Sequence, residues 1–441
     1  MRGGTEPASG GSSVRPASEH DATIPVHLFV RVANLHFSSS PPLSLYIHLP
    51  WCAKKCPYCD FNSHGLDAVR GERNRVPEVR YIEALIADLE HDLPRVWGRV
   101  VRTIFIGGGT PSLFSPDAID RLLTGVRARL PLPPDVEITL EANPGAVESG
   151  HFAGYRAAGV NRLSLGIQSF DPDSLRALDR IHGSEEALRA VAEAREAGFD
   201  NFNLDLMHGL PRQTIESALR DVDTALALKP AHLSMYQLTI EPNTLFHAKP
   251  PQLPDEDATA AMQQMLLTRV AEAGYGKYEV SAFALAGREC QHNLNYWRFG
   301  DYLGIGAGAH GKITDTSGIL RLWKLRHPDA YMLHAGTPSA IGGGQQLSPE
   351  EAAFEFMLNA LRLEQATSGT LFTERTGLSL SVVEMPLRRA EDRGLIHRAG
   401  DNLWPTELGR RFLNDLIELF LPTLPDNGHR TRPATDRKAL G

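Results

Sequence analysis

The chain has 441 residues, of which 42% are hydrophobic and 22% charged, and its net charge is −8. This ordinary composition leaves room for two or three folded domains, and the negative charge excludes nucleic-acid binding through bulk positive charge. The first twenty residues lack the apolar core of a signal peptide, and no apolar run approaches the roughly 18 residues of a membrane span, so we expect a cytoplasmic protein.

Short apolar runs alternate with helical patterns through the first two thirds of the chain. We expect strands at 43–49, 101–107, 136–142, 162–168, 201–209, 232–240 and 277–285. We expect helices between them at 77–92, 115–129, 147–158, 171–179, 185–197, 212–228 and 257–273. The strand runs read as apolar on both faces, which is typical of parallel strands covered by helices. The alternation predicts an α/β fold with a parallel sheet, open or curved into a barrel, whose chemistry gathers at the carboxyl ends of the strands.

The rest of the chain divides by composition. The N-terminal segment is rich in Gly, Ser and Pro, and the C-terminal tail is similar, so both are expected to be disordered. Residues 336–346, GTPSAIGGGQQ, resemble a linker, and the helical pattern that follows ends in a hairpin typical of a winged-helix-like domain. The expected segments are a disordered extension at 1–40, the barrel at 41–290, a connecting segment at 291–346, the C-terminal domain at 347–422 and a disordered tail at 423–441.

The motif with the clearest chemistry, WCAKKCPYCDFN, directly follows the first expected strand. Its thiols, Cys52, Cys56 and Cys59, have the spacing C-x3-C-x2-C and can wrap three corners of a [4Fe–4S] cubane, which normally takes four thiolates. The chain has only one other cysteine, Cys290. If Cys290 stays away, one iron keeps an open position that the amino and carboxylate groups of S-adenosylmethionine can chelate, by the logic that separates catalytic from structural zinc sites.

The alternative for this motif is a structural zinc site that adds a histidine, such as His48 or His64, to the three thiols. The position of the cysteine motif directly after a strand, with Tyr58 before the third cysteine, disfavours a zinc site. The same arrangement resembles the radical S-adenosylmethionine superfamily. The longer string YIHLPWCAKKCPYCDFNS resembles the oxygen-independent coproporphyrinogen oxidase-like group, and within it the HemW-type heme chaperones, from about Leu43 to Leu421.

This resemblance implies a fold and a set of cofactors. The fold would be a partial (β/α) barrel of the radical S-adenosylmethionine type with a C-terminal helical, winged-helix-like domain. The cofactors would be a [4Fe–4S] cluster on the three cysteines and S-adenosylmethionine. An electron donor such as flavodoxin or ferredoxin would be a partner if S-adenosylmethionine is cleaved.

Residues near strand ends are the expected cofactor contacts. GGGTPS (107–112) follows the second strand, and glycines let backbone approach a ligand closely, so consecutive amides there can contact the methionyl group. Taken singly, the polar residues at the other strand ends read as turn or capping residues. The resemblance instead assigns them cofactor contacts, with Tyr58 beside them: Tyr46, Gly108, Gly109, Thr110, Glu141, Gln168, Arg180 and Asp205.

A second motif, HNLNYW (292–297), resembles a string of the HemW-type proteins. The imidazole of His292 could ligate heme iron, and the two aromatics could cover a porphyrin face. The alternative is a buried structural histidine packed on aromatics. Cys290 and His310 are weaker candidates for heme ligands, with a small buried residue and a turn residue as their respective alternatives.

Two departures separate the chain from the dehydrogenases of this group. Those enzymes carry a cysteine two residues after the third thiol, where this chain has Phe61, and a tyrosine-rich N-terminal segment, whereas residues 1–40 contain no Tyr. We therefore predict a heme chaperone that delivers heme to acceptor hemoproteins such as respiratory cytochromes, meets membranes only through partners and does not oxidise coproporphyrinogen. The alternatives are a radical enzyme of the dehydrogenase type or with another substrate, and a winged-helix regulator, which the net charge of −4 over 347–420 disfavours.

Overall fold

The computed structural model describes residues 35, 37–66, 76–145 and 150–422. The segments expected to be disordered therefore lie outside the described residues, except for residue 35 and residues 37–40. Within the described part, no helix combines the length and apolarity needed to cross a membrane.

A single sheet of twelve strands, in the order β14-β13-β12-β11-β1-β4-β5-β6-β7-β8-β10-β9, organises residues 43–346. Its central strands are parallel: β11 (Asp301–Ile305), β1 (Leu43–Leu49), β4 (Val101–Gly108), β5 (Glu137–Ala142), β6 (Arg162–Gln168), β7 (Phe202–His208) and β8 (His232–Gln237). Antiparallel strands extend both edges: β12 (His310–Asp315), β13 (Gly318–Lys324) and β14 (Ile341–Gln346) on one side, and β10 (Ala282–Ala284) and β9 (Gly276–Glu279) on the other. A short parallel pair, β2 (Trp51–Cys52) and β3 (His64–Gly65), stands apart.

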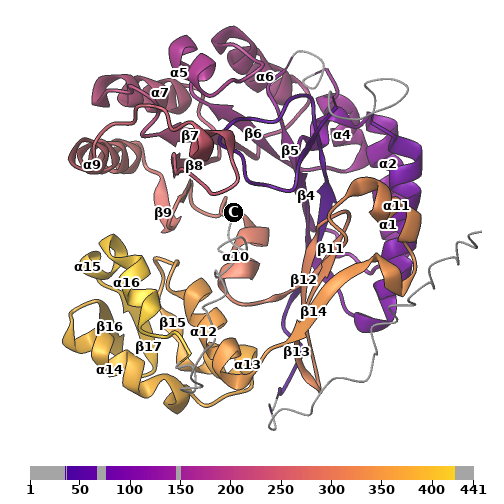
Figure 1. Ribbon diagram of the computed structural model, residues 1–441, viewed down its shortest axis with the longest axis vertical. Helices are drawn as coiled ribbons and strands as arrows, with labels where there is room; N and C mark the ends of the chain where they lie inside the picture. Colours follow the sequence, from indigo (N-terminus) through magenta and orange to yellow (C-terminus); the bar gives the residue numbers. More distant parts are fainter. Residues whose placement is uncertain (1–34, 36, 67–75, 146–149, 423–441) are drawn as a thin grey trace, which may run out of the picture. The chain divides into compact units, whose positions relative to one another are not determined.

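Helices cover the outer face of this curved sheet, and one short helix lies inside it (Figure 1). The covering helices are α1 (Glu78–Asp92), α2 (Pro116–Arg127), α4 (Phe152–Ala158), α5 (Pro172–Ala177), α6 (Ser184–Glu196), α7 (Ile215–Ala227), α9 (Glu256–Glu272) and α11 (Pro328–His334). Helix α10 (Gln291–Trp297) lies on the inner face, and α8 (Leu245–Ala248) follows β8.

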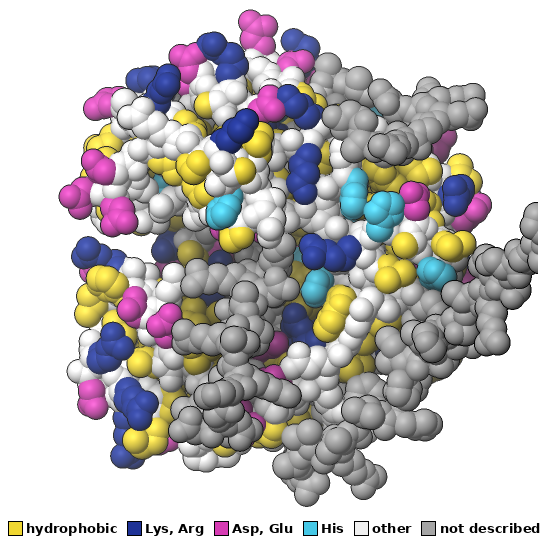
Figure 2. Space-filling view, in the orientation of Figure 1, with side chains coloured by type: hydrophobic (Ala, Val, Ile, Leu, Met, Phe, Trp, Pro, Cys, Tyr) yellow, Lys and Arg dark blue, Asp and Glu magenta, His cyan; other side chains and the backbone are white. Residues whose placement is uncertain are grey.

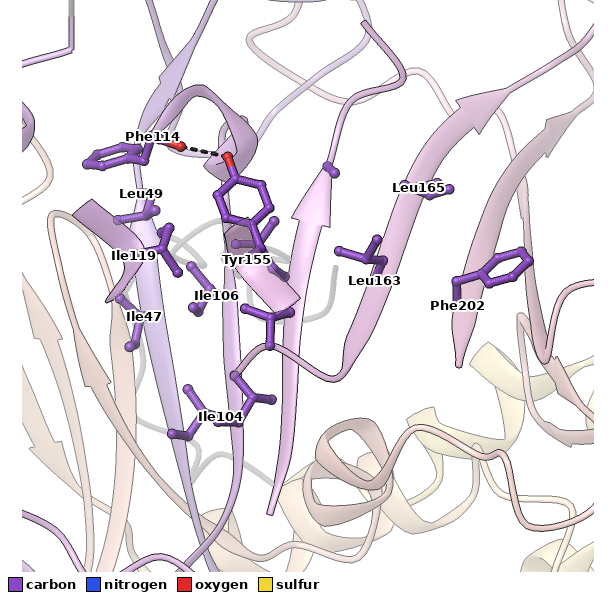
Figure 3. Close-up of a cluster of buried hydrophobic side chains, with 14 of the residues drawn as sticks. Ile47, Leu49, Ile104, Ile106, Phe114, Ile119, Tyr155, Leu163, Leu165 and Phe202 are labelled. Carbon is purple, nitrogen blue, oxygen red and sulfur yellow. Dashed lines mark hydrogen bonds between the residues drawn. The ribbon is translucent and has the colours of Figure 1, made fainter. Parts of the chain in front are cut away.

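The main core lies between the strands and the outer helices (Figure 3). Helix α2 illustrates how the core forms: its residues Ile119, Leu122 and Val126 recur at helical spacing and are fully buried. Its N-cap, Ser115, accepts a hydrogen bond from the amide of Ala118. Burying each such aliphatic side chain stabilises the fold by roughly 1.5–3 kcal/mol, so these side chains hold α2 against the sheet.

The opposite face of the strands is polar, which differs from the expectation of strands that are apolar on both faces. In β5, Glu137, Thr139 and Glu141 alternate with buried Ile138 and Leu140. The polar set faces α10, because the Glu137 carboxylate accepts hydrogen bonds from amides of that helix. Polar side chains therefore line the interior of the partial barrel, and the apolar core lies on the other face of the sheet.

A buried ion cluster fastens the antiparallel extension to α1. The ammonium of Lys324, at the end of β13, donates to Asp88 at 2.5 Å and to Asp92 at 2.6 Å, and all three side chains are buried. The hydroxyl of Tyr331 also donates to Asp88, at 2.7 Å. Burial raises the pKa of Asp88, and the Lys324 charge opposes that rise.

Two segments differ from their expected form. Residues 277–285 form two antiparallel strands, because the amide of Ser281 donates to the carboxylate of Glu279 and turns the chain there. Residues 341–346, expected in a linker, form edge strand β14. A Cβ at Gly343 would lie 2.3 Å from the indole of Trp323, so glycine is what lets β14 approach β13.

The C-terminal part has its own core, formed among residues such as Phe356, Phe372 and Leu387. It contains a three-stranded sheet in the order β15-β17-β16, which includes the expected hairpin. This helical arrangement with a terminal hairpin has the winged-helix-like form that the sequence predicts. Its elements are α12 (Pro349–Ala360), β15 (Thr367–Ser368), α13 (Gly369–Thr376), α14 (Glu384–Asp392), β16 (Ile396–Ala399), β17 (Asn402–Pro405), α15 (Glu407–Arg411) and α16 (Leu413–Glu418).

Candidate cluster and cofactor site

The three cysteines of the C-x3-C-x2-C motif lie on the segment that follows β1, with Cys52 at the end of β2 and Cys56 and Cys59 in the loop after it, and all three are half-buried. Neighbouring elements hold this loop in place. The ammonium of Lys54 contacts the carboxylate of Asp179 at 2.5 Å, and the carbonyl of Pro57 accepts the amide of Phe246 at 2.9 Å. The segment after α5 and helix α8 therefore both contact the cysteine loop.

Hydrogen-bond donors point at the thiols. The guanidinium of Arg180 lies 3.6 Å from Cys56 Sγ, and the Ser63 hydroxyl lies 3.8 Å from Cys59 Sγ. Burial raises the pKa of the Cys52 thiol, and a hydrogen bond with Thr110 opposes the rise. Donors around sulfur stabilise thiolates and tune iron–sulfur clusters, so this donor set fits a [4Fe–4S] cluster.

The fourth cysteine lies at the other end of the sheet. Cys290 is fully buried, and its Sγ lies 3.7 Å from Oε1 of Glu137, the first residue of β5. Burial raises the pKa of this thiol to about 12. Because β5 and β1 run parallel, the amino end of β5 is opposite the edge that carries the cysteine loop. Cys290 cannot supply the fourth ligand from there.

The alternative of a zinc site that uses His48 finds little support. His48 Nε2 lies 2.9 Å from the carbonyl of Asn62, which can only accept, so that nitrogen carries the proton. His48 Nδ1 then accepts the hydroxyl of Tyr46 at 2.9 Å. Burial lowers the His48 pKa to about 4. Among the described residues, no group of three or more His, Cys, Asp or Glu is arranged to hold a single metal ion.

The glycines of GGGTPS form a tight cradle beside the cysteine loop. Gly108 has φ +123°, and a Cβ there would lie 2.7 Å from the His48 ring. A Cβ at Gly109 would lie 2.5 Å from the carbonyl oxygen of Trp51. No residue with a side chain fits at either position without moving the neighbouring groups.

The amides of this cradle are already engaged, which differs from the expectation that they face the cofactor. The Gly108 amide donates to Glu141 Oε2 at 3.0 Å, the Gly109 amide to the Leu49 carbonyl at 2.8 Å, and the Thr110 amide to the Trp51 carbonyl at 2.7 Å. The last two bonds join the chain after β4 to Leu49, which ends β1, and to Trp51.

Two carboxylates face the interior next to the cradle. Burial raises the pKa of Glu141 to about 8, with a further contribution from the charge of Asp205. Burial also raises the pKa of Asp205, and hydrogen bonds from Asn203 and Ser164, at 2.8 and 3.0 Å, oppose the rise. The structure therefore places these two predicted residues close enough for the charge of Asp205 to raise the pKa of Glu141.

Three further residues were predicted as cofactor contacts: Gln168, Arg180 and Tyr58. Gln168 ends β6 with φ +68°, a strained conformation for a non-glycine residue and one that occurs preferentially at functional sites. Arg180 donates to the Gly166 carbonyl at 2.9 Å and also bonds Asn143. Tyr58 packs on Phe246, with ring centroids 6.3 Å apart. Sequence reasoning missed Asn143 and Asp179, since no motif marks them.

The imidazole of His292 is buried. Its Nδ1 lies 2.8 Å from the Thr103 hydroxyl, its Nε2 lies 3.1 Å from the Tyr296 hydroxyl, and its ring lies 5.1 Å from that of Phe105. Burial lowers its pKa to about 3. A heme iron bound here would displace one of these hydrogen bonds, so ligation by His292 stays a prediction. His310, the other histidine among the candidates, is exposed and stacks on Trp323.

Two protein-family models match the chain. The Radical SAM superfamily model matches residues 46–225, which run from β1 through most of α7, and the HemN C-terminal domain model matches residues 347–412. The three-cysteine loop at the carboxyl edge of the parallel sheet agrees with the first match. Fold and site thus define a radical S-adenosylmethionine protein with a HemN-type C-terminal domain.

Curated relatives extend the match over nearly their full length. The heme chaperone HemW of Escherichia coli (strain K12) is 52% identical over 382 residues, which cover 86% of this chain and 98% of the relative. The Haemophilus influenzae protein of the same name is 48% identical with the same coverage, and that of Bacillus subtilis is 33% identical over 86% of this chain and all of the relative. The chain belongs to the HemW family.

A solved structure supports the fold. Coproporphyrinogen III oxidase (HemN) from Escherichia coli has a TM-score of 0.72 to this chain at 24% identity, over 86% of this chain and 90% of that one. The likeness at this identity concerns the fold. It confirms the predicted partial barrel of the radical S-adenosylmethionine type with a C-terminal helical domain.

Proposed function

We propose that this chain is a heme chaperone that holds a [4Fe–4S] cluster on Cys52, Cys56 and Cys59, binds S-adenosylmethionine and heme, and passes heme to acceptor hemoproteins such as respiratory cytochromes. The name shared by its relatives supports the chaperone role. The observation that carries the site is the placement of the thiols: three lie together on one loop, and the fourth is buried against Glu137 at the far end of the sheet. A cubane on this loop therefore keeps one iron for another ligand.

The residues beside the loop suit S-adenosylmethionine. Once bound, the cluster supplies an iron with an open position and an electron for reductive chemistry. The carbonyls of the glycine cradle would accept the methionyl ammonium, since the amides are engaged. The guanidinium of Arg180, held by Gly166 and Asn143, would be a charge-assisted donor, and Glu141 with Asp205 would accept hydroxyl donors of the nucleoside.

The absence of a further thiol beside the loop favours the chaperone over the dehydrogenase. Phe61 stands two residues after Cys59 and exposes 52% of its surface. A phenyl ring offers neither a proton nor a ligand there, whereas a thiol would. We therefore expect no oxidation of coproporphyrinogen III by this chain.

The test uses anaerobically reconstituted protein. Heme should bind in stoichiometric amount and move to an apocytochrome faster than free heme does. Incubation with coproporphyrinogen III, S-adenosylmethionine and reduced flavodoxin should yield no protoporphyrinogen. Failure to bind heme, or turnover of the porphyrinogen, would contradict the proposal.

A second candidate, a radical enzyme with another substrate, is favoured by one observation. The interior is polar at the amino ends of β7 and β8: Asn203 Oδ1 accepts from His232 Nδ1 at 2.7 Å, and His232 Nε2 accepts from the Tyr278 hydroxyl at 2.9 Å. Such a wall could bind a polar substrate. Formation of 5′-deoxyadenosine in proportion to loss of a compound added from cell extract would support this candidate over the chaperone.

A further inference from the structure

The inner face of the sheet carries a strip of polar side chains that crosses three neighbouring strands. Ser164 in β6, Asn203 in β7 and His232 in β8 are paired in register. Asp205 lies two residues after Asn203, and side chains two apart in a strand point to the same face. The intervening residue, Leu204, packs in the outer core. We refer to Ser164, Asn203, His232 and Asp205 as the polar strip.

The hydrogen bonds along the polar strip have a single direction. The two hydrogens of the Asn203 amide bond Asp205 Oδ1 and Ser164 Oγ, each at 2.8 Å. The amide oxygen then accepts from His232 Nδ1 at 2.7 Å, so His232 Nε2 is left to accept the Tyr278 hydroxyl at 2.9 Å. Ser164 donates its own hydrogen to Asp205 Oδ2 at 3.0 Å. The donors of the strip therefore point toward Asp205.

Asp205 is the accessible end of the polar strip. Asn203 exposes 2% of its surface and His232 exposes 1%, whereas Asp205 is half-buried. The Asn203 amide has no capacity left, because its oxygen also accepts the Ser234 hydroxyl at 3.1 Å. A carboxylate can accept about four hydrogen bonds. Asp205 accepts from Asn203 and Ser164, with the Ser234 hydroxyl also in reach, so an occupant of the interior still finds an acceptor there.

The same contacts favour the ionised form of Asp205. Burial raises its pKa, and the donors of the polar strip, followed by the charge of the buried Arg162, oppose that rise. Glu141, the neighbouring carboxyl, has its pKa raised to about 8 by burial and then by the charge of Asp205. On the face drawn in Figure 2, charges of both signs are interspersed, so the surface charges there oppose one another. Local donors therefore make Asp205 the charged member of this pair.

We propose that Asn203 and His232 are positioning residues that hold the Asp205 carboxylate as a fixed, ionised acceptor for the hydroxyl groups of the S-adenosylmethionine ribose. The inference rests on the proposed function and deepens it, because it names the residues that orient one of the cofactor contacts. His232 fixes the orientation of the Asn203 amide, and that amide fixes Asp205. Both residues are too deeply buried to touch the ligand, so they act through Asp205.

The first test is isothermal titration calorimetry on anaerobically reconstituted protein without a reductant, so that no ligand is cleaved. The probes are S-adenosylmethionine and its 2′,3′-dideoxy analogue, which lacks both ribose hydroxyls. We expect wild type to prefer S-adenosylmethionine by at least about tenfold, and Asn203→Leu to lose that preference by binding S-adenosylmethionine alone more weakly. Asn161→Leu is the matched control: its amide bonds the backbone of Ile138 and Val136 at the amino edge of the sheet, so the preference should stay.

The outcomes separate the inference from the proposed function. Asn203→Leu that weakens both probes equally, or neither, would overturn the inference, and so would a wild type that binds the two probes alike. A wild type that binds neither probe would instead overturn the proposed function. Added to Asp205→Asn, the Asn203→Leu substitution should cost no further affinity, since it acts through Asp205, and an additive loss would count against that route.

A matched pair of substitutions tests His232 and also serves if Asn203→Leu does not fold. Asparagine at this position places an amide nitrogen near the site of Nδ1, whereas glutamine places one near the site of Nε2. We expect His232→Asn to keep the wild-type preference between the probes, because it can still donate to Asn203. His232→Gln should lose most of that preference, because its nitrogen lies on the side of Tyr278. Identical behaviour of the two variants would refute the role of His232.

Discussion

Replacing Gly109 by alanine is the sharpest perturbation of the cofactor cradle. The new Cβ would lie 2.5 Å from the carbonyl oxygen of Trp51, whereas ordinary contacts begin at 3.4 Å, so the two backbones must separate by about 0.9 Å. A shift of that size along the bond between the Thr110 amide and the Trp51 carbonyl would lengthen it from 2.7 Å to about 3.6 Å, beyond hydrogen-bonding distance.

The expected cost follows from these two effects. Overpacking costs about 1–3 kcal/mol and a lost hydrogen bond about 0.5–1.5 kcal/mol, so Gly109→Ala should lower the free energy of unfolding by about 2–4 kcal/mol. Because the cradle moves by nearly 1 Å against the cluster loop, S-adenosylmethionine should also bind more weakly than to wild type.

The assays are urea unfolding and a titration of the reduced cluster with S-adenosylmethionine, followed by electron paramagnetic resonance. Gly276→Ala in β9 is the control, since its Cβ would meet no atom closer than 3.8 Å. That control should behave as wild type. A Gly109→Ala protein with wild-type stability and affinity would refute the reasoning from the cradle.

Three further predictions test other parts of the molecule. Lys324→Met leaves two buried aspartates without their cation and should cost about 3–5 kcal/mol in urea unfolding; a loss below about 1 kcal/mol would speak against a buried ion cluster. Burial, then the Asp205 charge, raises the pKa of Glu141 to about 8 from an ordinary 4.5, so the folded protein keeps a proton that the unfolded chain releases, and stability falls as pH rises between these values. Glu141→Gln should flatten that fall in urea midpoints, and parallel profiles would contradict it. Arg180→Met removes a donor to Cys56 Sγ and should lower the cluster's midpoint potential in potentiometry, whereas an unchanged potential would leave Arg180 without that role.

The strands of the parallel sheet were readable from the sequence because each is a compact apolar run bounded by turns. Strands β1 and β6 have the expected bounds. The polar inner face of the sheet could not be predicted. Thr139 and Glu141 stand within an apolar run, and only the curved sheet shows that they lie on the side that faces α10. Strand β14 was missed for a related reason: three glycines predict a linker, and only their close fit against β13, such as that of Gly343 against Trp323, makes them a strand.

For the site, local spacing was informative and distant contacts were not. The cysteines, the glycines and the strand-end residues lie where their motifs place them. The separation of Cys290 from the loop depends on its contact with Glu137, 153 positions earlier in the chain. The bonded state of His292 depends on Thr103, 189 positions away. No local pattern encodes either contact.

The central claim is that three thiols leave one iron of a cubane without a protein ligand. Anaerobic reconstitution followed by Mössbauer spectroscopy, with and without S-adenosylmethionine, tests it most directly. We predict four irons per chain, with one iron site that changes its isomer shift when S-adenosylmethionine is added, and loss of the cluster in Cys56→Ala. Bound zinc in place of iron, or a four-iron spectrum that ignores the added nucleoside, would contradict the account.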